Sequence, residues 1–166
     1  NCRFVDILLG SFTTSGLDIL PFTSINHAVS FEDIHIIPQS GTTSAVGIKA
    51  SHVQKCHFKN ITTDVSSGSY LYGIRLYNNP LLNVFESIHT EDCQYGFYVE
   101  GGANNVFIGI EAQNAVANGV THFYTTGTRY QIQGIRTISG FTNQLNDGTN
   151  VVTASTDTDS VSIERG

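Results

Sequence analysis

The sequence predicts an all-β fold: a right-handed parallel β-helix, or solenoid, of about six coils, followed by an irregular C-terminal segment. Two interleaved repeats and a composition typical of strands and turns support this prediction. The chain of 166 residues contains sixteen glycines and three prolines, and 40% of its residues are hydrophobic while only 13% are charged. This composition, with many Asn, Ser and Thr residues, favours short strands joined by tight turns over long helices.

The first repeat is the four-residue pattern aromatic-x-x-Ile. Its copies begin at Phe4, Phe31, Phe58, Phe85 and Phe107, and a weaker copy begins at Ile132. Successive copies are separated by 27, 27, 27, 22 and 25 residues. This period is too short for repeated units of a strand and a helix, and it suits a coil of three short strands. Neighbouring coils would then be hydrogen-bonded about 4.8 Å apart.

The second repeat is the pattern Gly-apolar-x-apolar, and each copy falls between two copies of the first repeat. It begins at Gly16, Gly47, Gly73 and Gly96, and it continues less cleanly at Gly119 and Gly140. Two patterns that keep step over five or six cycles indicate one stacked unit with two recurring strands.

A bend within each first-repeat copy explains its residue types. In an unbroken strand, Phe58 and Ile61 would face opposite sides, because side chains alternate. The residue two positions beyond each aromatic is a turn former that tolerates unusual backbone angles: Asp6, Asp33, Asn60, Ser87, Gly109 and Gly134. A bend there turns both flanking side chains inward. We therefore expect three internal columns: the five phenylalanines; Ile7, Ile34, Ile61, Ile88, Ile110 and Ile135; and Ile48, Ile74, Phe97 and Val120.

The repeats divide the chain into a β-helix over residues 1–143 and a C-terminal segment over residues 144–166. The segment begins with a turn signal, Asn-Asp-Gly-Thr-Asn at 146–150, and residues 151–153 and 160–164 are predicted strands. We expect it to cap the helix or to pair with a neighbouring chain, with disorder as an alternative for its last residues. Because the sequence begins with Asn1 and contains no methionine, we interpret it as a piece of a longer protein.

Charge and cysteine content narrow the function classes. A formal net charge of −6 argues against a general nucleic-acid binder. No apolar run is long enough for a transmembrane helix, so no membrane insertion is expected. In the proposed register, Cys2 and Cys56 lie two coils apart, about 9–10 Å, which exceeds the reach of a disulfide. Together with Cys93 they are expected to be buried free thiols, as suits folding in a reducing cytoplasm.

The Phe-x-Asn/Asp-Ile copies, with a glycine opening the next strand, resemble the pectin-lyase-like β-helix superfamily over roughly residues 2–143. Stretches such as Gly-Phe-Tyr-Val-Glu-Gly-Gly-Ala-Asn-Asn-Val-Phe at 96–107 are most similar to bacteriophage tailspike and tail-fibre β-helices. This resemblance implies a virion protein of the phage tail, folded in the host cytoplasm. It also implies a homotrimer whose partners are other phage tail proteins and a bacterial surface polysaccharide.

Catalytic signals in the sequence are weak. It contains no metal-spaced Cys/His cluster, no Gly-x-Ser-x-Gly motif and no phosphate loop, so neither a metal nor a cofactor is expected. On the outward positions, Glu32, Lys59 and Glu86 would form a surface charge ladder. His89 and Glu111 would be stacked neighbours, and a His–carboxylate pair can move protons. Glu86, His89 and Glu111 are therefore the candidates for catalysis, since glycosidases need two carboxyl groups about 5 to 9.5 Å apart.

A second outward column reads Asp18, Lys49, Arg75, Tyr98 and Thr121, with Tyr70, Tyr72, Tyr77 and Tyr95 expected in the flanking turns. Aromatic faces and planar hydrogen-bonding groups suit sugar rings, and they equally suit a subunit interface. At this stage a glycan site, an oligomer contact and an ordinary surface all remain open for Arg75, Tyr98, Tyr72, Tyr77 and Tyr95.

The predicted function is that of a structural and receptor-binding (adhesin) domain of a phage tail fibre or tailspike, contacting host-surface glycan without cleaving it. The alternative is a polysaccharide lyase or glycoside hydrolase, a depolymerase of the same fold. A cellular adhesin, on the bacterial surface or secreted, is the third interpretation. The fold alone does not decide among them, because function depends on grafted sites.

Overall fold

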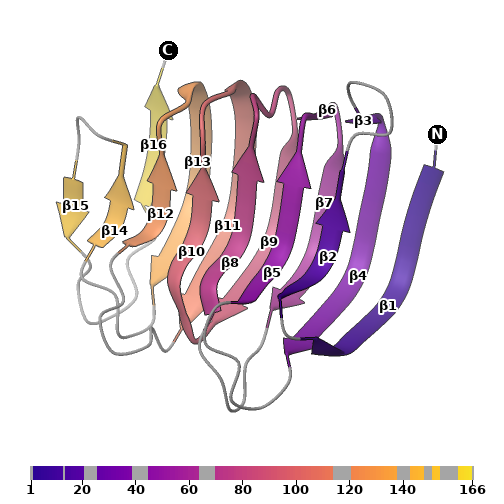
Figure 1. The fold of residues 1–166 in the computed structure, drawn as a ribbon. Helices are drawn as coiled ribbons and strands as arrows, with labels where there is room; N and C mark the ends of the chain where they lie inside the picture. The colour runs from indigo at the N-terminus through magenta and orange to yellow at the C-terminus, as the bar shows by residue number, and fades with distance from the viewer. Residues whose placement is uncertain are drawn as a thin grey trace.

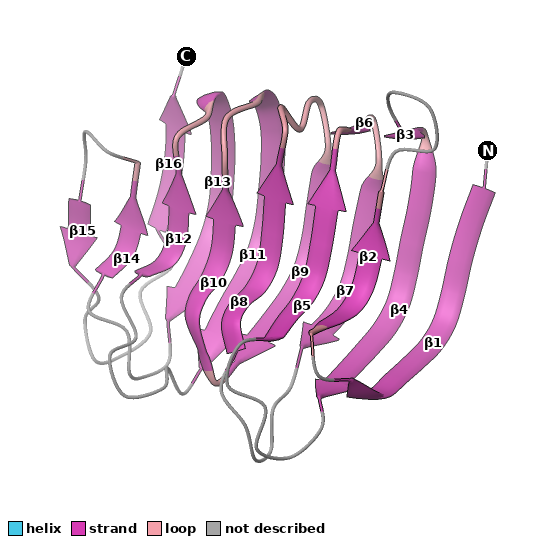
Figure 2. Ribbon diagram, viewed as in Figure 1, coloured by secondary structure: helices cyan, strands magenta, loops and turns pink. Residues whose placement is uncertain are grey.

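The computed structural model describes residues 2–12, 14–20, 26–38, 45–63, 70–113, 121–137, 143–147, 151–153 and 161–165. Within these segments all regular structure is β-strand, as Figure 2 shows. Two seven-stranded sheets lie face to face (Figure 1). In each sheet the strands lie side by side, and their order from one end of the solenoid to the other follows the chain from the N-terminus towards the C-terminus. No helix in the described segments is long and apolar enough to cross a membrane.

The first sheet, called sheet A, contains six parallel strands and one antiparallel strand. In spatial order they are β1 (Cys2–Phe12), β4 (Val29–Pro38), β7 (His57–Thr63), β9 (Val84–Glu91), β11 (Ala103–Gln113), β13 (Thr128–Thr137) and antiparallel β16 (Val161–Arg165). Successive parallel strands pair in the register that the first repeat predicts, with Phe31 beside Phe58 and Ile34 beside Ile61.

The second sheet, called sheet B, carries the second repeat. Its strands are β2 (Ser15–Ile19), β5 (Ala45–Ser51), β8 (Tyr70–Tyr77), β10 (Cys93–Val99), β12 (Thr121–Thr125), β14 (Asn143–Asn146) and antiparallel β15 (Val151–Thr153). A short third face is formed by β3 (Asn26–His27) and β6 (Val53–Gln54), and single bridges continue it to Leu81 and Ala103. The parallel β-solenoid predicted from the repeats is thus confirmed.

The expected number of about six coils is wrong, because the solenoid has about four turns. Each sheet has six parallel strands, whereas the pairing that the described residues show along the third face is limited to β3 with β6, to single bridges at Leu81, and to Ala103 with Thr128. The number of repeat copies equals the number of parallel strands in one sheet. It exceeds the number of turns, because a strand at either end of a sheet does not by itself make a closed turn.

The bend positions adopt the left-handed backbone conformation that the residue types suggested. The φ angles are 55° at Asp6, 54° at Asp33, 51° at Asn60, 55° at Ser87, 59° at Gly109 and 71° at Gly134. Two of these residues also bond across coils, since Asn60 Nδ2 donates to Asp33 Oδ1 at 3.0 Å. The bend turns both Phe58 and Ile61 into the core, where both are fully buried.

The phenylalanines of sheet A form one stacked column. Ring centroids are 5.2 Å apart for Phe4–Phe31, 4.9 Å for Phe31–Phe58, 4.6 Å for Phe58–Phe85 and 5.0 Å for Phe85–Phe107, with all rings nearly parallel. The last four residues are buried, but Phe4 is 43% exposed. Phe4 therefore departs from the expected buried column, because no further ring covers it at the end of the stack.

The glycines of the second repeat are required by space. A Cβ atom at Gly73 would lie 2.7 Å from Thr90 Cγ2 and 2.8 Å from the carbonyl oxygen of Gly96. At Gly47 it would lie 2.5 Å from the carbonyl oxygen of Gly73. Gly47 and Gly73 lie inside β5 and β8 and do not open these strands as the repeat suggested; they leave room for Thr63 and Thr90 of sheet A, which pack directly against the backbone of sheet B.

The third internal column continues differently from the prediction. Ile48, Ile74 and Phe97 are buried and in register, as expected. The next member is Phe123, which pairs with Phe97, while Val120 lies outside the described residues. The alignment on Gly119 was therefore wrong. The spacing of the copies changes in this part of the chain, so the glycine no longer marks the register.

The predicted strands of the C-terminal segment are confirmed. β15 pairs antiparallel with β14, and β16 pairs antiparallel with β13, so that an antiparallel strand covers this end of both sheets. β14, which begins at Asn143, pairs parallel with β12.

A buried ladder of polar groups crosses the third face and was not predicted. Asn83 Nδ2 donates to Asn105 Oδ1 at 2.9 Å and to the Val53 carbonyl at 3.0 Å, while its own Oδ1 accepts from the Cys56 amide. Asn105 Nδ2 in turn donates to the Pro80 carbonyl. These side chains satisfy backbone groups where the third face has only single bridges.

Two of the three expected buried thiols can be followed, whereas the side chain of Cys2 lies outside the described residues. Cys56 and Cys93 are both buried. Burial raises the pKa of both thiols, to about 12 for Cys93, because the thiolate is disfavoured away from water. Both are therefore packing residues of the core rather than reactive cysteines.

Candidate functional site

Four tyrosines, Tyr72, Tyr95, Tyr98 and Tyr124, form one cluster on the outer surface of sheet B, here called the tyrosine face. They come from β8, β10 and β12, which are neighbours in the sheet. Tyr72 lies in register with Tyr95, and Tyr98 lies in register with Tyr124. All four side chains are half-buried, so each ring packs on its neighbours and still reaches solvent.

Tyr98 is the centre of this cluster. Its ring centroid is 4.7 Å from that of Tyr124, in a stacked arrangement, and 4.8 Å from that of Tyr72. Tyr95 meets Tyr98 edge-on at 5.1 Å and stacks on Tyr72 at 5.5 Å. Burial raises the pKa of Tyr72 and of Tyr98, so both hydroxyls stay protonated at neutral pH and can donate hydrogen bonds.

Arg75 contacts the tyrosine rings and also forms an ion pair with Glu100. Its Cζ lies 5.2 Å from the Tyr72 ring centroid, 5.5 Å from that of Tyr77 and 6.0 Å from that of Tyr98. Its Nη2 lies 2.9 Å from Glu100 Oε1. Cation–π contact and ion pairing together hold the guanidinium beside the rings.

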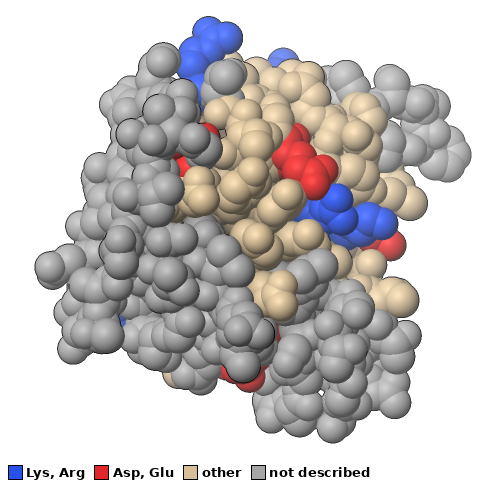
Figure 3. Space-filling view, turned by 60° about the vertical axis from the view of Figure 1, so that its left-hand side comes forward, with Lys and Arg blue, Asp and Glu red and all other residues tan. Residues whose placement is uncertain are grey.

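Lys49 extends the tyrosine face along the same column, with its Nζ 5.7 Å from the Tyr77 ring centroid. Asp18, Lys49 and Arg75 lie on consecutive strands in register, as predicted. Figure 3 shows a small group of basic and acidic side chains bordered by uncharged residues. The arrangement offers flat rings and fixed donors on one surface, which is what a sugar ring or a flat protein partner requires.

The structure brings together Arg75, Tyr98, Tyr72, Tyr95 and Tyr77, as the sequence suggested, but corrects how they are placed. These tyrosines lie within β8 and β10, not in flanking turns. The same holds for Tyr70, the first residue of β8, whose side chain lies outside the described residues.

The residue beside Tyr98 is Tyr124, not Thr121, and sequence reasoning missed it. The signal was present: Phe123-Tyr124 repeats the inward-outward order of Phe97-Tyr98. Thr121 lies beside Tyr95 instead.

The outer surface of sheet A, here called the charged face, is a ladder of ion pairs. Lys59 Nζ lies 3.0 Å from Glu86 Oε1, and His57 Nε2 lies 3.2 Å from Glu86 Oε2. Arg3 pairs with Glu32 across β1 and β4. Hydrogen bonds from Arg3 and then from Ser30 lower the pKa of Glu32 to about 2, and the hydrogen bond from Lys59 lowers the pKa of Glu86. The predicted neighbours are therefore in place, and Glu86 is occupied by basic partners.

His89 lies between two carboxylates on the same face. Its Nδ1 is 3.0 Å from Glu111 Oε1 and its Nε2 is 3.4 Å from Glu91 Oε1. Arg136 Nη1 lies 2.9 Å from Glu111 Oε2. The predicted contact of His89 with Glu111 is present, while the participation of Glu91 and Arg136 was not foreseen. Contacts of an imidazole with carboxylates are found both in proton relays and in surface ion networks.

Among the described residues, no group of three or more His, Cys, Asp or Glu side chains is arranged to hold a metal ion. The chain matches no protein-family model, no curated protein and no solved structure.

Proposed function

We propose that this chain is a structural and receptor-binding domain of a phage tail fibre or tailspike, and that its tyrosine face binds a host-surface glycan without cleaving it. The observation that supports this proposal is the cluster of four packed tyrosine rings on one outward surface of the solenoid, with Arg75 in cation–π contact beside them. The proposal takes the right-handed coil and the phage assignment from the resemblance to tailspike β-helices.

The tyrosine face has the physical properties that a glycan site needs. The C–H faces of a sugar pack on aromatic rings, and the ring hydroxyls are available as polar partners. Because Tyr98 already contacts Tyr72, Tyr95 and Tyr124, little side-chain freedom is lost when a ligand arrives. The rings project from paired strands and not from loops, so their spacing is fixed by the sheet.

The proposed assembly is a homotrimer in the virion tail, with other phage tail proteins as further partners. Three solenoids packed side by side would each present outer sheet surfaces to one another. A tyrosine cluster is also a common feature of such subunit contacts. The test of the glycan proposal must therefore separate ligand binding from assembly.

The experiment compares Tyr98→Ala with Tyr98→Phe in the assembled protein, using binding to host cells and to purified surface polysaccharide, and sedimentation to follow the oligomer. Tyr98→Ala is expected to weaken binding at least about tenfold, because it removes the ring at the centre of the cluster. Tyr98→Phe keeps the ring and should retain most of the binding. Lys59→Ala on the charged face serves as the matched surface control. If Tyr98→Ala dissociates the oligomer instead, the tyrosine face is a subunit interface and the glycan proposal is wrong.

A polysaccharide depolymerase is the second candidate, favoured by the contact of His89 with both Glu91 and Glu111. Glycoside hydrolysis uses two carboxyl groups that flank the scissile bond, one as acid and the other as base or nucleophile. Polysaccharide depolymerisation that is lost in Glu111→Gln or Glu86→Gln, with binding kept, would establish this activity. Retained binding with no change in polymer length would establish the non-enzymatic domain.

A further inference from the structure

We propose that the N-terminal end of the solenoid, formed by the outer edges of β1 and β2, is a docking surface for one further parallel β-coil. This coil would be supplied by polypeptide preceding residue 1 in a longer chain. The proposal does not depend on what the tyrosine face binds. It rests on an apolar pocket, on the contrast between the two ends of the solenoid, and on the register of the stacked rings.

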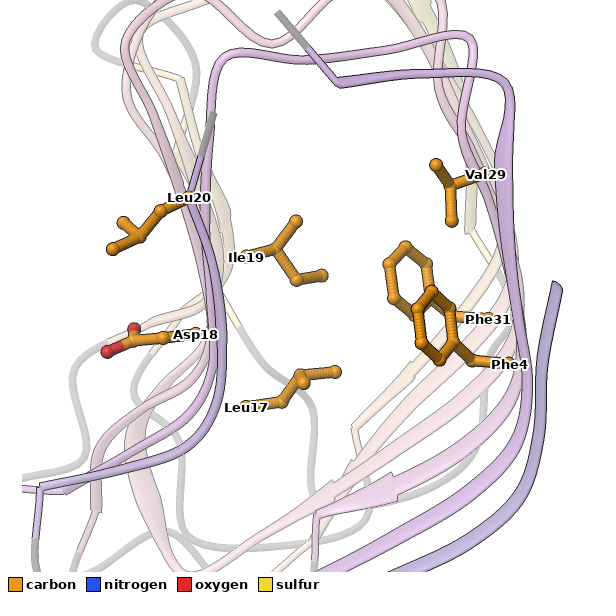
Figure 4. Close-up of a pocket in the computed structure, with 7 residues that line it drawn as sticks. All are labelled: Phe4, Leu17, Asp18, Ile19, Leu20, Val29 and Phe31. Carbon is orange, nitrogen blue, oxygen red and sulfur yellow. The ribbon is translucent and has the colours of Figure 1, made fainter. Parts of the chain in front are cut away.

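The pocket opens between the two sheets and has a volume of about 470 Å³. Phe4, Phe31 and Val29 point into it from sheet A, and Leu17 and Ile19 point into it from sheet B (Figure 4). Asp18 and Leu20 point away from this space. These inward residues belong to the same columns as the buried core, yet Phe4 is 43% exposed where Phe31, one coil further in, is 4% exposed. An uncovered slice of core of this kind is costly to leave in water.

The two ends of the solenoid differ in how their sheets finish. At the C-terminal end, β15 and β16 pair antiparallel with the last parallel strands and so change the strand direction. At the N-terminal end, β1 and β2 are the outermost strands of their sheets, and within the part of the chain that the structure describes each pairs with one neighbour, β4 and β5 respectively. Their free edges keep the parallel orientation of the strands behind them. An unpaired edge of this kind can take up a further strand, and a coil that repeats the chain's own order of strands would bring a parallel one.

The stacked rings specify what this coil must contain. From Phe4 to Phe85, successive rings are 4.6 to 5.2 Å apart and 27 residues apart. A coil that continues the stack therefore places an aromatic residue over Phe4 and large aliphatic residues over Ile7 and Leu17. It also places a residue that tolerates a left-handed conformation beside Asp6, whose φ is 55°.

The chain itself supplies a probe with these properties. A copy of residues 28–54, 27 residues long, is fused directly before Asn1. The copied Phe31 then lies 27 positions ahead of Phe4, and the copied Val53-Gln54 lies 27 positions ahead of β3, just as β3 lies 27 positions ahead of β6. Docking should slow amide exchange in β1 at least about tenfold at the amides that face away from β4. It should also raise the thermal midpoint by about 5 °C or more.

The matched control carries Phe31→Asp and Ile34→Asp in the added copy alone, so that length and linker are unchanged while the inward positions are charged. Slow exchange in the fusion and fast exchange in the control support the proposal. Equal exchange in both, with the original solenoid still folded by circular dichroism, overturns it. So does a concentration-dependent dimer of the unextended chain that Phe4→Asp abolishes, because a second copy would then be the occupant of this end.

Discussion

The charged face and the tyrosine face lie on opposite sheets of one solenoid and share the same strand spacing, yet they are held together differently. On sheet A, contacts between coils are ion pairs such as Lys59–Glu86 and Arg136–Glu111. On sheet B, they are ring contacts such as Tyr98–Tyr124 and Tyr72–Tyr95. The stacking of coils therefore brings equivalent positions of neighbouring coils together. The residue type at each position then decides whether the surface is charged or aromatic.

The two kinds of contact respond differently to solvent. Exposed ions are well hydrated and screened by salt, so their pairs add little to the stability of the fold. Aromatic rings lose little hydration free energy when they pack together, and their exposed faces leave an apolar surface that a ligand or a partner can cover. The tyrosine face is accordingly the better candidate for a binding surface, and the charged face for one that keeps the sheet soluble.

The largest expected effect comes from the core that both faces cover. Phe58→Ala should lower the free energy of unfolding by about 3–5 kcal/mol, because it empties a fully buried position between two stacked rings. Chemical denaturation of the same assembly measures it. Lys59→Ala, the next residue but outward, is the control and should leave the denaturation midpoint nearly unchanged. Equal losses in the two variants would show that the inward and outward positions have been assigned wrongly.

The next largest effect is expected where sheet A presses on the backbone of sheet B. Gly73→Ala should lower the free energy of unfolding by about 1–3 kcal/mol, because the added methyl group would lie 2.7 Å from Thr90 Cγ2. Gly10→Ala is the matched control, since its nearest neighbour would be 3.8 Å away. Thermal denaturation distinguishes them, and a harmless Gly73→Ala would mean that the two sheets are less closely packed at this point.

A smaller effect separates the two faces directly. Tyr98→Ala should lower the free energy of unfolding by about 1–2 kcal/mol, since one ring loses its contacts with three others. This loss should not change between low and high salt. The effect of Glu111→Gln, which weakens the contacts with His89 and Arg136, should shrink as salt is added. Denaturation at two salt concentrations tests the contrast, and a salt-dependent Tyr98→Ala would contradict it.

The smallest effect concerns protonation on the charged face. The Glu32 carboxyl should titrate near pH 2, well below its ordinary value, because Arg3 and Ser30 bond to its ionised form. A lowered pKa means that this group's stabilisation is fully present above about pH 4.5 and is lost as the pH falls towards 2. Carboxyl carbon NMR follows the titration. Arg3→Gln should move the Glu32 midpoint upward, whereas Tyr98→Phe on the opposite face should leave it where it is.

Much of the fold could be predicted because a solenoid repeats its contacts. Phe58 meets Phe85 for the same reason that Phe31 meets Phe58, so one correctly placed copy places the next. The predicted register is wrong where the spacing between copies of the repeat changes. The copies before Phe107 and Ile132 are shorter, and there the second repeat was aligned on Gly119 instead of on Phe123 and Tyr124.

The candidate site was predicted only in outline for the same reason. Arg75 and Tyr98 were paired correctly from their phase, but Tyr124 was missed with the shifted register. The contact of Asn83 with Asn105 between coils, and that of His89 with Glu91 within β9, depend on how side chains turn at the end of a strand. The spacing of residue types along the sequence does not specify the direction in which these side chains turn.

The sequence by itself determined the strand order, the inward columns and the bends, because alternation and backbone tolerance act within a few residues. Asp6 and Asn60, for example, both adopt the left-handed conformation that Asp and Asn tolerate at the bend position of the repeat. Only the tertiary structure decided the number of closed turns, the antiparallel ends and the union of four tyrosines into one surface. These depend on which strands find partners across the sheet, and pairing between distant segments is fixed by the assembled core and not by any local stretch of chain.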